Sequence, residues 1–178
     1  MKKLMFASAV AIACTGAQAQ FSAEVGYAPT TITIKDSGDK IKTSPSAVRG
    51  LVGYELHPNL ALEGMLAFGL SDSDVSLNGR TVPTVNIKID SVTGIYLKPK
   101  MKLSDAFEVF ARLGFADMKI KSSSPGYSES GSESSSSYGA GLRYAITSNY
   151  SVSADYMSYI NKNGGKANGW TVGVGFKF

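Results

Sequence analysis

Charged residues recur at alternate positions along this 178-residue chain, and they offer its main possibilities for chemistry. Six are acidic and six are basic: Glu24, Glu55, Glu63, Asp90, Glu108 and Asp155 against Arg49, Lys88, Lys98, Arg112, Arg143 and Lys177. Side chains two apart on a strand share a face, so we expect these charges on one inward face. Buried charges need partners, and the balance of signs favours mutual pairing. A narrow ion path through the same network is the alternative.

Nucleophilic catalysis and zinc binding find few suitable side chains here. The sequence has one histidine, His57, which precedes Pro58 in a short turn, and one cysteine, Cys14, near the N-terminus. No Ser–His–acid arrangement can be argued around His57, and one histidine without a nearby thiol argues against zinc. We therefore predict no enzyme activity, no catalytic residue, no metal site and no cofactor.

Net charge gives no indication of a nucleic-acid partner. The formal charge is +4, and it falls to +2 (4 − 2) if Lys2 and Lys3 are removed with a leader. No basic cluster interleaved with aromatic residues is present, although such a cluster is the usual footprint of nucleic-acid binding. We expect no nucleic acid among the partners.

The last nine residues, 170–178, show most clearly the type of secondary structure on which these charges lie. Five apolar side chains alternate with smaller or charged ones: Trp170, Val172, Val174, Phe176 and Phe178 against Thr171, Gly173, Gly175 and Lys177. This period of two predicts a β-strand with one large apolar face. A transmembrane barrel turns such a face to lipid and keeps the small, polar face for its lumen.

The same alternation predicts eight strands in one domain, residues 20–178. They lie near 21–34, 48–56, 60–70, 87–98, 107–116, 138–146, 150–156 and 170–178. Three connections are tight turns, at 57–59, 104–106 and 147–149, and four are longer and polar, at 35–45, 71–86, 121–137 and 162–168. Short turns on one side and long loops on the other are typical of an outer-membrane barrel. Ile32 and Ile34 switch parity after Pro29, so we expect a bulge or bend there.

The N-terminus predicts export. Lys2 and Lys3 precede an apolar run of about ten residues at 4–13, and residues 17–19 form an Ala-x-Ala cleavage site. We therefore predict a signal peptide over 1–19 and a mature N-terminus at Gln20. A membrane anchor is an alternative, but the run is too short for a helix to cross ~30 Å of hydrocarbon. A lipoprotein modified on Cys14 is a second alternative.

Aromatic residues gather near both ends of the expected strands. One group contains Tyr54, Phe107, Tyr144, Tyr150 and Phe176, and the other contains Phe68, Phe115, Tyr138, Tyr156 and Trp170. Two aromatic girdles are expected where rings sit at the two membrane interfaces. A soluble β-sandwich or lipocalin-like barrel is the alternative, because soluble cores also contain aromatic residues.

With these features the mature chain resembles the small eight-stranded outer-membrane barrels of Gram-negative bacteria. These include the OmpX type, the opacity-type surface antigens and the transmembrane part of the OmpA type, often grouped as porin-family proteins. The last strand resembles their C-terminal assembly signal, in which a terminal Phe follows apolar residues at alternate positions. The resemblance implies an all-β, antiparallel, up-and-down transmembrane barrel in the outer membrane. It also implies lipid, lipopolysaccharide and the assembly machinery as partners.

We therefore expect a structural or surface-interaction protein, like an adhesin or surface antigen, whose lumen is filled by paired charges. The network residues are Glu24, Arg49, Glu55, Glu63, Glu108, Arg112, Arg143 and Asp155. A narrow channel or transporter for small solutes or apolar molecules is the alternative. The serine-rich segment 122–137 is expected to be a mobile surface loop, because it has little apolar surface to bury. The sequence names no host-surface or extracellular ligand.

Overall fold

The computed structural model describes residues 20–36, 39–71, 73–78, 80–124, 127–162 and 164–178, and nearly all of them lie in strands. The strands are β1 (Phe21–Asp36), β2 (Asp39–Thr43), β3 (Ser46–His57), β4 (Leu60–Ser71), β5 (Ser73–Leu77), β6 (Arg80–Lys102), β7 (Phe107–Ser124), β8 (Tyr127–Ala145), β9 (Tyr150–Lys162) and β10 (Gly165–Lys177). No helix among the described residues is long and apolar enough to cross a membrane. The signal peptide expected at 1–19 lies outside the described residues.

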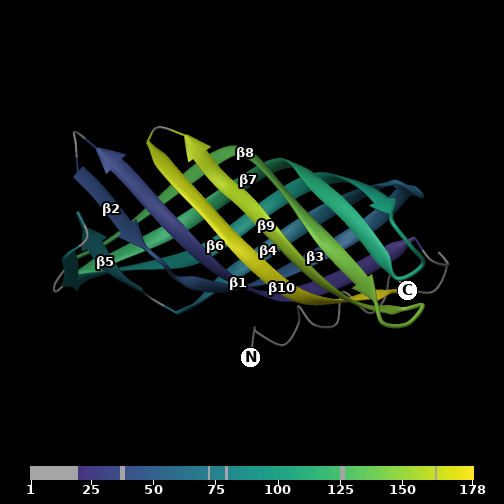
Figure 1. Ribbon diagram of the computed structural model, residues 1–178. Helices are drawn as coiled ribbons and strands as arrows, with labels where there is room; N and C mark the ends of the chain where they lie inside the picture. Colours follow the sequence, from purple (N-terminus) through teal and green to yellow (C-terminus); the bar gives the residue numbers. More distant parts are fainter. Residues whose placement is uncertain (1–19, 37–38, 72, 79, 125–126, 163) are drawn as a thin grey trace, which may run out of the picture.

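Eight of these strands close into an antiparallel barrel. Each strand pairs with the next in the order β1, β3, β4, β6, β7, β8, β9 and β10. The barrel closes where β10 pairs back onto β1, from Ser22↔Lys177 to Ile34↔Gly165. Figure 1 shows a cylinder of tilted strands, with the C-terminus at one end and β2 and β5 at the other. Closure leaves no unpaired sheet edge, which a span in lipid requires. The predicted eight-stranded barrel is confirmed.

Two short strands prolong the wall beyond β3 and β4. β2 and β3 share one register against β1, which continues from Ile32↔Thr43 to Pro29↔Ser46 across the interruption at Ser44 and Pro45. β5 follows β4 and bridges β2 to β6. The predicted irregularity at Pro29 is wrong, since β1 runs unbroken. The interruption lies on the neighbouring strand, at Pro45, which has no N–H to donate to a ladder.

One end of the barrel has the short turns that the sequence predicts, and the other end differs from the prediction. The short turns are confirmed: β3 ends at His57 and β4 begins at Leu60, and the other two turns have four residues each, 103–106 and 146–149. The long polar loops are wrong, because the strands continue through most of those segments. The serine-rich segment forms a hairpin in unbroken register from Phe107↔Tyr144 to Ser124↔Tyr127. Its register is inherited from the barrel, and its serines are small enough to face inward, where Ser137 Oγ donates to Ser158 O at 2.9 Å.

The middle of the outer face is apolar. Exposed side chains there are Val25, Val52, Leu66, Ile95, Leu97, Leu113, Leu142, Val152, Val172 and Val174. Tilted aromatic pairs flank them, with Phe107–Tyr144 at 4.9 Å between ring centroids on the short-turn side and Tyr156–Trp170 at 4.9 Å on the far side. In the final strand Trp170, Val172, Val174 and Phe178 are exposed, and Phe176 packs between Tyr150 and Phe178. A soluble barrel would bury these rings, so that alternative is wrong.

Candidate functional site

An ion-pair network fills the lumen at the level of the apolar outer belt. Arg49 of β3 donates from Nη1 to Asp155 Oδ1 of β9 at 2.8 Å and from Nη2 to Asp155 Oδ2 at 2.5 Å. This bidentate geometry suits the planar guanidinium and is among the stronger hydrogen-bond arrangements in proteins. Arg49 Nη2 also lies 3.3 Å from Glu24 Oε1 of β1. The group therefore ties three strands together across the barrel.

Arg112 of β7 connects the same carboxylates to the opposite wall. Its Nη1 donates to Asp155 Oδ2 at 2.7 Å, and its Nε donates to Glu63 Oε2 of β4 at 2.5 Å. Glu63 Oε1 in turn lies 2.8 Å from Lys98 Nζ of β6. The Phe110 ring faces both cations, with Lys98 Nζ at 4.4 Å and Arg112 Cζ at 4.5 Å from its centroid. Such a ring adds cation–π attraction in a desolvated site.

The charges inside this network balance. Arg143 of β8 lies 3.6 Å from Glu24 Oε2 and 3.5 Å from Glu108 Oε1, so four cations face four carboxylates: Arg49, Lys98, Arg112 and Arg143 with Glu24, Glu63, Glu108 and Asp155. Arg49 and Arg112 are each 1% exposed. Desolvated charges of this kind hold together only because every one has partners, and removing one leaves another buried and unpaired.

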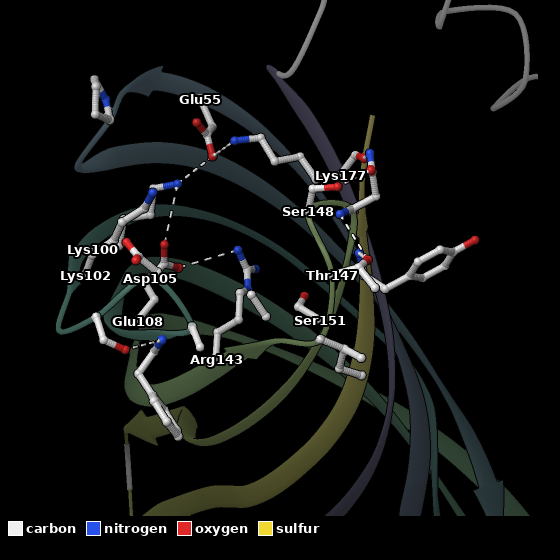
Figure 2. A pocket seen from close by; sticks show the side chains of 18 residues that line it. Glu55, Lys100, Lys102, Asp105, Glu108, Arg143, Thr147, Ser148, Ser151 and Lys177 are labelled. Carbon is white, nitrogen blue, oxygen red and sulfur yellow. Dashed lines mark hydrogen bonds and ion pairs between the residues drawn. The ribbon is translucent and has the colours of Figure 1, made fainter.

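The network opens into a charged vestibule on the short-turn side, shown in Figure 2. Its volume is about 650 Å³. Glu55 of β3 bridges two lysines there, Lys100 at 2.5 Å and Lys177 at 3.2 Å, and Lys100 also lies 3.9 Å from Glu108. Glu108 therefore links the vestibule to the buried network through Arg143. The structure thus brings together all eight residues of the expected network.

Two residues expected on the inward face lie elsewhere. The register of β6 against β7 shifts between Ile89 and Ser91, so Asp90 sits at a bulge and pairs with Lys121 at 2.9 Å near the barrel exterior. Beyond the bulge the parity of β6 reverses. Lys88 is exposed, while Ile87 and Ile89 are buried inside the barrel. The inward placement of Lys88 and Asp90 is wrong because one extra residue turns a strand over.

Above the charged network the lumen becomes apolar. Buried side chains of this layer are Ile32, Val75, Ile87, Ile89, Val92, Met118, Met157, Tyr159, Ile160 and Ala167. Tyr159 touches the layer below through its hydroxyl, which accepts from Arg49 Nη1 at 3.3 Å. The Tyr96 hydroxyl is hydrogen-bonded to Ser137 Oγ at 3.0 Å. The described part of the lumen is therefore closed by packed side chains at two successive levels.

The outer face at this level is polar. Lys166 of β10, Thr33 of β1 and Lys42 of β2 stand side by side in one row across three adjacent strands. Both lysines are exposed. Adjacent strands lie ~4.8 Å apart, so the two lysine backbones are about 10 Å apart with Thr33 between them. The row therefore places two cations on the barrel surface, and the sheet holds the backbones of both lysines in place.

Sequence reasoning missed both the apolar upper layer and the polar row. The available signal was the parity of Ile32 and Ile34, which we attributed to a bend at Pro29. Even-numbered residues of β1 face inward from Glu24 to Ile32 without interruption. The strand therefore keeps the same face inward along its length. What changes is the chemistry of that face, which becomes aliphatic instead of charged where the strand leaves the membrane.

Comparison with known proteins agrees with this architecture. A family model described as "Outer membrane protein beta-barrel domain" matches residues 4–178. The chain is 27% identical over 185 residues to the attachment invasion locus protein of Yersinia enterocolitica, with 100% of each chain covered.

Solved structures share the fold. Ail, the attachment invasion locus protein of Yersinia pestis, in complex with the heparin analogue sucrose octasulfate, superposes with a TM-score of 0.65 at 24% identity, covering 91% of this chain and 100% of that one. Neisserial surface protein A gives a TM-score of 0.70 at 15% identity, covering 89% and 97%. At these identities the likeness concerns the fold.

Proposed function

The chain belongs to the outer membrane protein beta-barrel domain family, and we propose that it attaches the cell to extracellular polyanions through the outer end of its barrel. It is an integral outer-membrane barrel with a structural or surface-interaction role, and its lumen is filled by paired charges. The observation that carries the proposal is the strand-built extension beyond the aromatic girdle, with Lys166, Thr33 and Lys42 in a row on its outside.

Two lines support a sulfated polysaccharide as the ligand. The relatives in Yersinia are attachment proteins by name, and the Yersinia pestis protein was crystallised with a heparin analogue. In this chain Lys42 and Lys166 are held by a hydrogen-bonded sheet, so little conformational freedom is lost by their backbones on binding. Two ammonium groups on either side of a hydroxyl suit successive sulfates along a chain.

The proposal is tested by binding biotinylated heparin to the protein in lipid nanodiscs. We expect Lys42→Ser/Lys166→Ser to weaken binding about two- to tenfold, as loss of two exposed ion pairs predicts. The matched control is Lys119→Ser/Lys121→Ser on β7, the strand opposite β1 in the barrel order. Equal losses in both variants, or none in the first, would remove the row from the binding surface.

Salt provides a second test of the same contact. Exposed ion pairs are screened over a Debye length of about 8 Å at physiological ionic strength. Heparin binding through this row should therefore weaken steeply as salt rises, while binding by apolar contact should not. A salt-insensitive affinity would contradict the polyanion assignment.

Export and assembly are a further part of the proposal. A leader over 1–19 is supported by its basic, apolar and Ala-x-Ala segments, and N-terminal sequencing of the mature protein should give Gln20. The final strand, with Trp170, Val172, Val174, Phe176 and Phe178 on one side, is proposed as the segment that the assembly machinery reads. Phe178→Ala should lower the amount in the outer membrane more than Tyr138→Ala does.

No catalytic step is assigned to this barrel. The family is one of outer-membrane barrels, and His57 lies exposed at the short-turn end, where its Nδ1 accepts a hydrogen bond from Asn59 N at 3.3 Å. That contact orders the turn between β3 and β4. Nothing in the described surroundings of His57 supplies a serine and an acid in hydrogen-bonding order.

A further inference from the structure

A cavity of about 270 Å³ opens at the end of the barrel opposite the short turns, which is the extracellular end in bacterial outer-membrane barrels. Five consecutive strands of the closed wall, β7, β8, β9, β10 and β1, surround it. Its lower part is made by Ile32, Met118, Ile160 and Ala167, and its upper part by Ile34, Ile120 and Gly131. These side chains alternate with exposed polar residues on the same strands, so the cavity lies inside the barrel.

Most side chains of the lining are aliphatic, and its polar members are Ser132, Glu133, Lys162 and Lys166. Ile, Met and Ala side chains offer no hydrogen bond to a polar ligand and no ring to stack on. Transfer of an apolar chain from water into such a site is favourable by about 25 cal/mol per Å² of buried surface. A cavity of ~150 Å³ already binds benzene, whereas drug-sized pockets begin near ~300 Å³. The space therefore suits one short aliphatic chain.

The rim of this cavity carries one ion pair. Lys162 of β9 and Glu133 of β8 both face inward above the aliphatic lining, and Lys162 Nζ lies 3.1 Å from Glu133 Oε1. The two side chains are 53% and 44% exposed, so their pairing in water is weak and exchangeable. A ligand carboxylate can take the place of Glu133 at Lys162 while Glu133 turns to solvent.

Among the described residues, packed side chains close the barrel below the cavity. Buried Ile89, Val92 and Met157 lie below it, and the Arg49–Asp155 network lies lower still. A molecule that enters from outside is therefore held and not passed through. The cavity is therefore a binding pocket and not the narrow channel that the sequence left as an alternative.

We infer that the mouth of the barrel binds a medium-chain fatty acid, with the aliphatic chain between Ile32, Met118 and Ile160 and the carboxylate at Lys162. The inference goes beyond attachment through the outer lysine row. Lys166 belongs to the row and also to the lining of the cavity, but the inference rests on the aliphatic residues and Lys162. The chain fits because the lining is aliphatic, and the head group fits because the inward-facing rim offers an exchangeable cation.

The test is a titration of decanoate into the protein in lipid nanodiscs, followed by NMR of the isoleucine δ methyl groups. Ile32, Ile34, Ile120 and Ile160 report on the cavity. Ile95, which is exposed on the outer face, reports on decanoate that merely enters the lipid. We expect saturable shifts in the cavity isoleucines and a small, unsaturated shift in Ile95.

Two glycine variants localise the binding. Gly131 stands opposite Ile120, and a Cβ added there meets no atom within 4 Å, so Gly131→Phe projects into the cavity. Gly64 also has no atom within 4 Å of an added Cβ, but it lies exposed on the outer face, so Gly64→Phe is the matched control. We expect Gly131→Phe to weaken decanoate binding at least tenfold and Gly64→Phe to leave it unchanged.

A rim variant tests the head-group contact. Lys162→Gln should weaken decanoate binding about two- to fivefold, the range of an exposed ion pair, and leave decanol binding unchanged. Absence of saturable shifts, shifts that follow that of the lipid-facing Ile95, or full binding by Gly131→Phe would each overturn the assignment. Equal effects of Lys162→Gln on decanoate and decanol would overturn the carboxylate contact.

Discussion

Leu113 and Met118 lie on the same unbroken strand, β7, yet they face opposite sides of the wall. Leu113 is 54% exposed on the outside, next to inward-facing Arg112. Met118 is 4% exposed inside the barrel, next to outward-facing Lys119. The lower half of the strand therefore places apolar residues outside and charges inside. The upper half does the reverse.

The medium around each half explains the reversal. Lipid surrounds the lower half, so its outside is apolar and its polar groups gather in the lumen. Water surrounds the upper half, so burial of apolar surface drives side chains inward as in any soluble barrel. The boundary on β7 falls just above Phe115, which belongs to the outer aromatic girdle. One sheet thus holds two cores of opposite chemistry, stacked along one axis.

The largest effect is expected from breaking the polar core. Arg112→Ala removes one of the two cations that pair with Glu63 and one of the two that pair with Asp155. Losing one side of a buried pair costs about 3–5 kcal/mol. Urea unfolding in liposomes should show this loss, and single-channel recording should show a leak that the wild type lacks. A large, steady conductance through wild-type protein would contradict a closed lumen.

Breaking the apolar core gives the next effect. Ile89 is 1% exposed inside the barrel, and Ile→Ala changes in a packed core cost about 2–5 kcal/mol. Ile95→Ala is the matched control, because Ile95 lies six residues along the same strand on the lipid side. We expect a much smaller loss of unfolding free energy for Ile95→Ala in the same assay. Equal losses would mean that the upper interior is not a packed core.

An arginine added to the outer face should be costly in the lower half, which faces lipid, and tolerated in the upper half, which faces water. Leu113→Arg places a cation among lipid chains and should cost about 2–4 kcal/mol if it lies near the membrane midplane. Ser130→Arg, on the exposed upper part of β8, should change stability by about 0.5 kcal/mol or less. Folding yield into liposomes compares the two directly. Similar yields would place the membrane boundary elsewhere.

The sequence predicted the lower half well because its pattern is strong. Five apolar residues alternate in 170–178, and charges such as Arg49, Arg112 and Asp155 alternate with apolar residues on their own strands. In a closed barrel, side chains on the face opposite the lipid must point into the lumen, so the charges lie there. Strand count, short turns and outward girdle residues followed from period two alone.

The upper half escaped prediction for physical reasons. The serine-rich arms of β7 and β8 have low strand propensity, and only their continuity with a formed barrel fixes their register. The bulge at Asp90 turned Ile87 and Ile89 inward, and nothing local in the sequence marks it. The Lys162–Glu133 pair joins two strands whose relative register depends on the whole sheet, so neither residue stood out among other polar ones.

The smallest effect compares ion pairing in the two halves. Lys98–Glu63 in the lumen and Lys162–Glu133 at the mouth have similar lengths, 2.8 and 3.1 Å, but the first pair is 2% and 3% exposed and the second 53% and 44%. Water screens the second pair, so a double-mutant cycle with Lys162→Gln and Glu133→Gln should give a coupling of about 1 kcal/mol or less that fades with salt. The cycle with Lys98→Met and Glu63→Gln should give a larger coupling that salt hardly changes, because the lumen excludes ions. Equal couplings with equal salt dependence would show that the lumen is as wet as the mouth, and the contrast between the two cores would then fail.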